Sequence, residues 1–207
     1  HLWYISGMLG AAILLLLMRR LPSIVLLGSS LFLFLVGVAI QYSGNYHYVN
    51  SDALDRVFNT NWVHRNFLFF SYPFFCAGYL IRKHSIHEKI TAKKAGVFCF
   101  LGIVLLLCES FLNYFHEGRD GGFDNYLSLS VACPFVFILF MKLNFFGGGK
   151  NFALYSSAVY FVHSLILSIF QMSLEIGETL LTILVIIVSV LVSFFIIKIN
   201  HRVKFIL

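Results

Sequence analysis

LLTILVIIVSVLVSFFII, residues 180–197, is a run of 18 residues that contains no charged side chain. A transmembrane helix needs about 20 consecutive apolar residues to cross the hydrocarbon of a bilayer. A buried helix of a soluble domain rarely stays apolar on all sides over this length. The run therefore predicts a membrane-spanning helix near the end of the chain.

Six further apolar stretches precede this one and have comparable length. They cover residues 2–17, 24–40, 67–81, 97–112, 127–141 and 154–172. Because only helices and closed barrels satisfy their backbone hydrogen bonds in lipid, stretches of this length predict helices. We expect an all-α integral membrane protein, a polytopic bundle of about seven transmembrane helices.

The charged residues between these stretches alternate in sign from one connection to the next. One set of connections holds twelve basic residues and the single acid Glu88: Arg19, Arg20, Arg82, Lys83, Lys89, Lys93, Lys94, Lys142, Lys150, Lys198, Arg202 and Lys204. The other set holds eight acids and three basic residues: Asp52, Asp55, Glu109, Glu117, Asp120, Asp124, Glu175, Glu178, Arg56, Arg65 and Arg119. By the positive-inside rule the first set is cytoplasmic, which predicts that His1 lies outside and Leu207 inside.

The composition agrees with a membrane protein and excludes several other classes. The chain of 207 residues is 59% hydrophobic and 12% charged, against about 25% charged in a soluble domain. The net charge of +6 belongs to the cytoplasmic connections, where it meets lipid headgroups, so no nucleic-acid partner is expected. The four cysteines lie inside apolar stretches without metal-ligand spacing, and we expect no metal.

The chain opens on His1 rather than on a methionine, and its predicted start lies outside the membrane. Together these features favour the back portion of a longer protein. We expect residues 1–207 to form a single transmembrane domain that is incomplete at its N-terminus.

The connection from Gln41 to Asn66 is the longest outside loop and is rich in tyrosine, tryptophan and histidine. It is either a functional loop or an interfacial segment whose aromatic rings sit at headgroup level. Arg65 lies just before the third stretch. It either binds a carboxylate or phosphate ligand, or it forms an ion pair with Asp52 or Asp55.

The sixth stretch carries polar side chains at helical spacing. Ser156, Tyr160, His163, Ser164, Ser168 and Gln171 fall on one face of a helix. Polar groups at this depth are costly, so they indicate a function. His163 is a candidate general base, because imidazole titrates near neutrality, or else a neutral histidine bonded to a neighbouring helix.

Three local strings resemble the membrane acyltransferase family 3. The first is His1-Leu2-Trp3-Tyr4 at the start of a span, and the second is RNFLFFSYPFF at residues 65–75, which runs into GYLI at 78–81. The third, YSSAVYFVH at residues 155–163, is similar to the late S-x-x-I-Y-x-x-H string of that family. Order and spacing agree over nearly the whole chain.

The resemblance implies ten helices with both termini in the cytoplasm, of which these would be the last seven. It implies transfer of an acyl group, often acetyl, from acyl-coenzyme A to a sugar hydroxyl of an envelope polysaccharide. It also implies the inner membrane of a bacterium, with lipid and a glycan acceptor as partners. Among the residues of the strings, it implies catalytic candidates His163, Tyr160 and His1, and substrate-binding candidates Arg65, Trp3 and Ser156.

The chain departs from the family in one respect. The family's first span carries an arginine and a histidine separated by ten residues, and that histidine is regarded as the catalytic base. No arginine here is followed by a histidine eleven positions later, so we expect this pair upstream of His1.

Two alternatives come from other functional classes. The membrane part of serine racemases is similar too, which would make the chain a transporter-like module. A seven-span receptor is disfavoured, because an Asp/Glu-Arg-Tyr string after the third span and an Asn-Pro-x-x-Tyr string in the last span are both missing.

Overall fold

The computed structural model describes residues 3–120, 122–143, 149–173 and 177–203. All seven predicted spans are helical, and the described residues contain no β-strand. The prediction of an all-α membrane fold is therefore confirmed.

The chain divides into two units, residues 3–144 and residues 145–207 together with the first two residues. The elements of the first unit are α1 (Trp3–Met18), α2 (Ser23–Asn45), α3 (Asp52–Phe58), α4 (Asn61–His64), the π-helix η1 (Phe67–Ser71), α5 (Tyr72–Lys83), α6 (Ile86–Lys89), α7 (Ala92–Tyr114) and α8 (Leu129–Lys142). The second unit holds α9 (Gly149–Ser173) and α10 (Glu178–Val203), which pack along each other. The expectation of a single domain over residues 1–207 stays a prediction.

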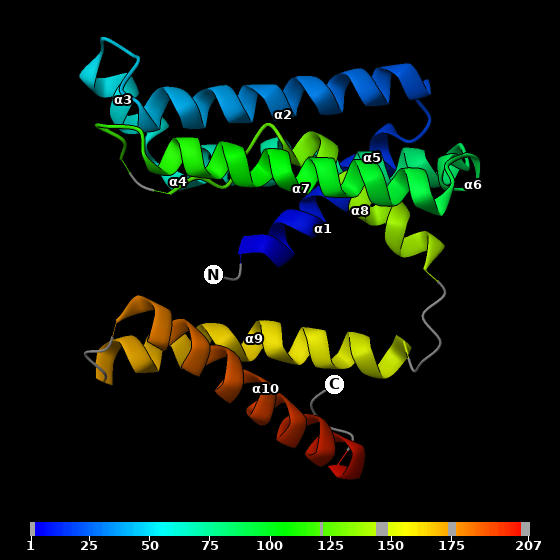
Figure 1. Ribbon diagram of the computed structural model, residues 1–207, viewed down its shortest axis with the longest axis vertical. Helices are drawn as coiled ribbons and strands as arrows, with labels where there is room; N and C mark the ends of the chain where they lie inside the picture. Colours follow the sequence, from blue (N-terminus) through cyan, green and yellow to red (C-terminus); the bar gives the residue numbers. More distant parts are fainter. Residues whose placement is uncertain (1–2, 121, 144–148, 174–176, 204–207) are drawn as a thin grey trace. The chain divides into compact units, whose positions relative to one another are not determined.

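Within the first unit, α5 packs against both α1 and α2, and α7 packs along α8 (Figure 1). Tyr72 is fully buried at the centre of the first group, where its hydroxyl lies 2.9 Å from the Ser29 hydroxyl. The second pair approaches closely at Gly102, where an added Cβ would lie 2.7 Å from the Cα of Ala132. Small residues of this kind let transmembrane helices approach closely.

Four described helical segments are long and apolar enough to cross a membrane: Ser23–Asn45, Ala92–Tyr114, Leu154–Ser173 and Thr179–Ile199. Two shorter apolar helices cover Ile5–Met18 and Leu129–Lys142. Large apolar side chains of α7 stay exposed, for example Leu112 at 70%. In water such a surface would be a liability, whereas lipid tails solvate it. The chain is a multi-pass membrane protein.

The third predicted span is a π-helix followed by an α-helix rather than one regular helix. The Asn66 side-chain oxygen accepts hydrogen bonds from the backbone N–H groups of Leu68 (2.9 Å) and Phe69 (3.1 Å), which caps the start of η1. Pro73 then lies in the first turn of α5, which continues directly from η1. This segment begins directly after Arg65, so the cap fixes the backbone beside a predicted site residue.

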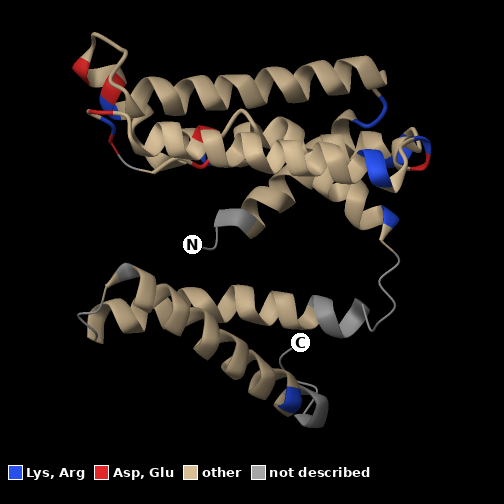
Figure 2. Cartoon of the chain, viewed as in Figure 1, with Lys and Arg blue, Asp and Glu red and all other residues tan. Residues whose placement is uncertain are grey.

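Charges separate along the first unit as the sequence predicted (Figure 2). We call one end basic; it comprises the connection between α1 and α2, the end of α5, α6, the start of α7 and the end of α8. These segments hold Arg19, Arg20, Arg82, Lys83, Lys89, Lys93, Lys94 and Lys142, with Glu88. We call the other end acidic; it comprises residues 46–66 and the connection between α7 and α8. Which end faces the cytoplasm stays a prediction from the positive-inside rule.

Candidate functional site

A buried glutamine on α2 holds the connection between α7 and α8 at the acidic end. Gln41 is fully buried, and its side-chain oxygen accepts hydrogen bonds from the backbone N–H groups of Asn125 (2.9 Å) and Asp124 (3.4 Å). Gly37, one turn earlier, permits this approach: an added Cβ would lie 2.7 Å from the Phe69 Cβ and 3.3 Å from Asn125 Nδ2. Gln41 therefore joins segments that are 84 residues apart in sequence.

Asn125 links the same connection to α4. Its side chain is fully buried, and Nδ2 donates to the His64 carbonyl at 3.4 Å. Arg65, which follows His64 in the sequence, forms an ion pair with Asp124. These contacts gather Gln41, Asn125, His64, Arg65 and Asp124 into one set of residues, which we call the outer polar cluster.

Apart from the Arg65–Asp124 ion pair, four buried side-chain atoms of this cluster lack a hydrogen-bond partner among the described residues. They are the nitrogen Nε2 of Gln41, the oxygen Oδ1 of Asn125 and both ring nitrogens of His64. A buried polar group without a hydrogen bond is costly and rare, so the cluster is a polar centre inside an otherwise apolar unit.

His64 adds a neutral ring to the outer polar cluster. The residue is 2% exposed, and burial lowers the pKa of its imidazole, with the neighbouring charge of Arg65 adding to this effect. The ring is therefore uncharged at neutral pH.

A second polar network lies beside the outer polar cluster. Glu109 on α7 accepts hydrogen bonds from the Tyr42 hydroxyl (2.6 Å) and from the backbone N–H groups of Leu127 (2.7 Å) and Ser128 (2.8 Å). Both N–H groups immediately precede α8, so the carboxylate caps the start of that helix.

Asn113, one turn after Glu109, extends this network. Its Nδ2 donates to the Tyr42 hydroxyl at 2.8 Å, and its Oδ1 accepts from the Tyr46 hydroxyl. Tyr42, Glu109 and Asn113 line a cavity of about 570 Å³ together with Ser128 and apolar residues of α7 and α8. The acidic end thus combines a cavity with several hydroxyl and amide groups.

Arg65 pairs with neither of the two partners that the sequence suggested. The alternatives Asp52 and Asp55 are wrong, because the guanidinium meets Asp124 instead. Asp55 is taken by His47, whose Nδ1 lies 2.8 Å from its carboxylate, while Nε2 lies 3.1 Å from Asp120. The contact with Asp55 raises the pKa of His47.

The predicted polar face of the sixth span is carried by α9 of the second unit. Nδ1 of His163 lies 3.2 Å from the Val159 carbonyl, and the Tyr160 ring centroid lies 5.5 Å from that of His163. If Nδ1 carries the proton, as this contact requires in a neutral ring, Nε2 keeps its lone pair for an incoming proton. Ser156 is exposed on the same helix.

Two predicted site residues cannot be placed in the site. His1 lies outside the described residues, and Trp3 begins α1 without a described side chain. The structure brings His163, Tyr160 and Ser156 onto one helix, and Arg65 belongs to the outer polar cluster of the other unit. Among the described residues, no group of three His, Cys, Asp or Glu side chains lies close enough to hold a metal ion.

Sequence reasoning missed Gln41 and Asn125. Gln41 follows directly after a 17-residue apolar stretch, and this was its one signal in the sequence. Asn125 stood in a connection rich in glycine and aspartate that read as an ordinary turn.

The family model for the acyltransferase domain of family 3 matches residues 1–198. The chain has no significant match among curated proteins or among solved structures. Because the matched region covers almost the whole chain, the chain belongs to the membrane acyltransferase family 3.

Proposed function

We propose that this protein moves an acyl group, acetyl in the first instance, from acyl-coenzyme A to a sugar hydroxyl of an envelope polysaccharide. The observation that carries the proposal is the family match over residues 1–198, which assigns acyl transfer in general. The donor and the acceptor are the parts that we infer.

The acceptor is assigned to the acidic end of the first unit. The cavity lined by Tyr42, Glu109, Asn113 and Ser128 offers hydroxyl, carboxylate and amide groups that can hydrogen-bond sugar hydroxyls. Arg65 belongs to the neighbouring outer polar cluster and holds it in place through Asp124, which makes it a positioning residue. By the positive-inside rule this end is extracytoplasmic, where an envelope glycan is accessible.

The donor is assigned to the basic end. Coenzyme A is a polyanion, and clustered Lys and Arg side chains raise the local concentration of such a substrate. The same rule makes this end cytoplasmic, the compartment that supplies acyl-coenzyme A.

His163 is the residue of this chain that we propose as a base for the acceptor hydroxyl, beside the family's histidine that is expected upstream of His1. It stands 14 residues after the start of α9, or about 21 Å along the axis, which is deep enough to lie within the membrane. The hydroxyl proton passes to Nε2 as the hydroxyl oxygen attacks the thioester carbonyl carbon. The carbon–sulfur bond then breaks, coenzyme A takes the proton as its thiol, and the acceptor keeps the acyl group.

The proposal is tested with membranes that contain the intact protein, labelled acyl-coenzyme A and a glycan acceptor. His163→Ala is expected to lower transfer about 100-fold or more, the usual contribution of a general base. The control is His84→Ala at the basic end; among the described residues, the His84 ring bonds to the Ser23 hydroxyl at 2.8 Å.

The two results separate the parts of the proposal. Equal transfer by wild type and His163→Ala would remove the role of His163 and leave the reaction standing. Wild-type membranes that transfer no acyl group to any glycan would overturn the proposed function itself.

A further inference from the structure

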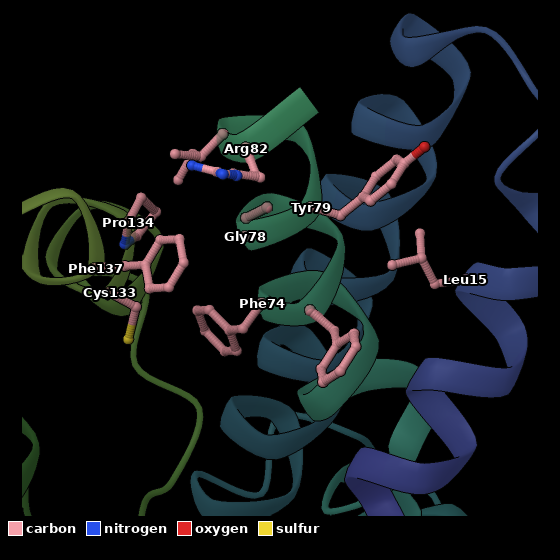
Figure 3. A pocket seen from close by; sticks show the side chains of 11 residues that line it. Leu15, Phe74, Gly78, Tyr79, Arg82, Cys133, Pro134 and Phe137 are labelled. Carbon is pink, nitrogen blue, oxygen red and sulfur yellow. The ribbon is translucent and has the colours of Figure 1, made fainter. Parts of the chain in front are cut away.

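A second large cavity lies in the first unit and extends toward the basic end (Figure 3). Its volume is about 550 Å³, and its walls come from α1, α5 and α8. Small residues explain why it exists: Ala77 and Gly78 of α5 and Cys133 and Pro134 of α8 all line it, and none of them fills the space. Phe137 lines it from α8, and Phe74 lines it at the end opposite Arg82 (Figure 3).

The chemistry of the walls is almost uniform. Apolar side chains make up nearly all of the lining, and among the described residues Arg82 is the one charged group that contributes. A space of this size is much larger than one water needs, and its walls offer water few hydrogen bonds. The cavity therefore suits a hydrocarbon chain.

Arg82 stands at the end of this cavity that faces the basic end. The cavity follows α5 from Phe74 to Arg82, eight residues or about 12 Å along the helix. The Arg82 side chain extends over the cavity on the side of Pro134 and Phe137 (Figure 3). Its Nη1 lies 3.4 Å from Nε2 of His87, a contact that leaves most of the guanidinium donors available for an anion.

A hydrocarbon-lined space with a cation at one end matches a molecule with an apolar chain and an anionic head. Phospholipid is the solvent around a membrane-spanning unit, and basic pockets between helices on the cytoplasmic side bind anionic headgroups. Arginine pairs with phosphate through two parallel hydrogen bonds, which gives the pair direction as well as charge.

We propose that this cavity binds one anionic phospholipid, with an acyl chain between α5 and α8 and the phosphate on Arg82. This inference does not depend on the proposed function. The lipid fills the space that Ala77, Gly78, Cys133 and Pro134 leave open, and it anchors the basic end in the headgroup layer.

The proposed position of the lipid's acyl chain is tested with Gly78→Leu in the intact protein. An added Cβ at Gly78 would lie 3.9 Å from Phe137, an ordinary contact, so the larger side chain fits and fills the cavity. The matched control is Gly28→Leu on α2, where no described atom lies within 4 Å of an added Cβ. Native mass spectrometry of the purified protein with added phosphatidylglycerol measures the bound lipid.

The proposed position of the lipid phosphate is tested with Arg82→Gln. The control is Lys83→Gln, because Lys83 neighbours Arg82 in sequence but does not line the cavity. Phosphatidylglycerol is compared with phosphatidylcholine, whose headgroup carries no net charge. Arg82→Gln is expected to lower the preference for phosphatidylglycerol about fivefold, the effect of one basic side chain near an anionic headgroup. Lys83→Gln should leave the preference within about twofold of wild type.

The expected result is one bound phosphatidylglycerol on wild type and on Gly28→Leu, and about tenfold less on Gly78→Leu. Equal lipid on Gly78→Leu and Gly28→Leu would overturn the proposal, as would a wild-type protein without lipid preference. The proposal would also be overturned if acyl-coenzyme A displaced the bound lipid and added phosphatidylglycerol did not. That result would assign the cavity to the acyl donor. If Gly78→Leu does not fold, the Arg82→Gln comparison alone decides.

Discussion

Removing the Glu109 carboxylate should detach the start of α8 from α7. Oε1 of Glu109 accepts from the Tyr42 hydroxyl and the Leu127 N–H, and Oε2 accepts from the Ser128 N–H. Hydrogen bonds to a charged group contribute about 1.5 to 3 kcal/mol each, and we use the lower value because Glu109 is half-buried. Glu109→Ala removes the acceptor of all three bonds and should cost about 4 to 5 kcal/mol of unfolding free energy.

Glu109→Gln provides an intermediate case. The amide oxygen can replace Oε1, whereas the amide nitrogen would face the Ser128 N–H as a second donor. One of the two backbone bonds is lost, so the cost should be about 1.5 kcal/mol. The control is Glu117→Gln, an exposed carboxylate in the same connection, which should change stability by less than about 0.5 kcal/mol.

Two measurements check this series. Denaturant unfolding in mixed micelles gives the free energies, and amide hydrogen exchange reports the N–H groups of Leu127 and Ser128 directly. Exchange should accelerate at both residues in Glu109→Ala and mainly at Ser128 in Glu109→Gln. Unchanged exchange at these two amides in Glu109→Ala, with unfolding equal to that of Glu117→Gln, would refute the capping role.

Two further predictions concern helix contact and pH. Gly102→Ala should destabilise the protein by about 1 to 3 kcal/mol, because its Cβ would lie 2.7 Å from the Ala132 backbone. The control is Gly96→Ala on the same helix, whose Cβ would meet nothing within 4 Å and which should be neutral or stabilising. Equal melting temperatures of the two variants would contradict this prediction. His47 bonded to Asp55 has a raised pKa, so its contribution to stability is complete below the unfolded-state pKa of about 6.5 and is lost as pH rises through the folded-state pKa. His47 also contacts Asp120 of the connection between α7 and α8, so it bridges this connection to Asp55 of α3. Amide hydrogen exchange in the connection should therefore accelerate with pH beyond the intrinsic rate in wild type but not in His47→Gln. Identical pH profiles would contradict this bridge.

Much of the fold could be predicted because hydrocarbon imposes strong constraints on sequence. Residues 180–197 and 24–40 have to be helical in lipid, because a single segment can satisfy its own backbone hydrogen bonds there only as a helix. The break in the third span was harder to predict. The π-helix over Phe67–Ser71 begins at the Asn66 cap, whose geometry no apolar pattern records.

The candidate site was predictable only where its residues share one helix. Tyr160 and His163 fall on one face of α9 because helical spacing is a local property. The bond from Gln41 to Asn125 joins residues 84 positions apart, and the Arg65 partner was predicted wrongly for the same reason. Long-range pairs depend on how the connection between α7 and α8 folds back onto α2, and no spacing in the sequence encodes that.

The proposed reaction is tested most directly by acyl transfer in native membranes with and without this protein. Labelled acetyl-coenzyme A is supplied on the cytoplasmic side, and label on the envelope glycan is counted after hydroxylamine treatment, which releases esters. The account predicts ester-linked label with the intact protein and none without it. Equal labelling of the glycan in both membranes would contradict the claim that this family member acylates an envelope sugar.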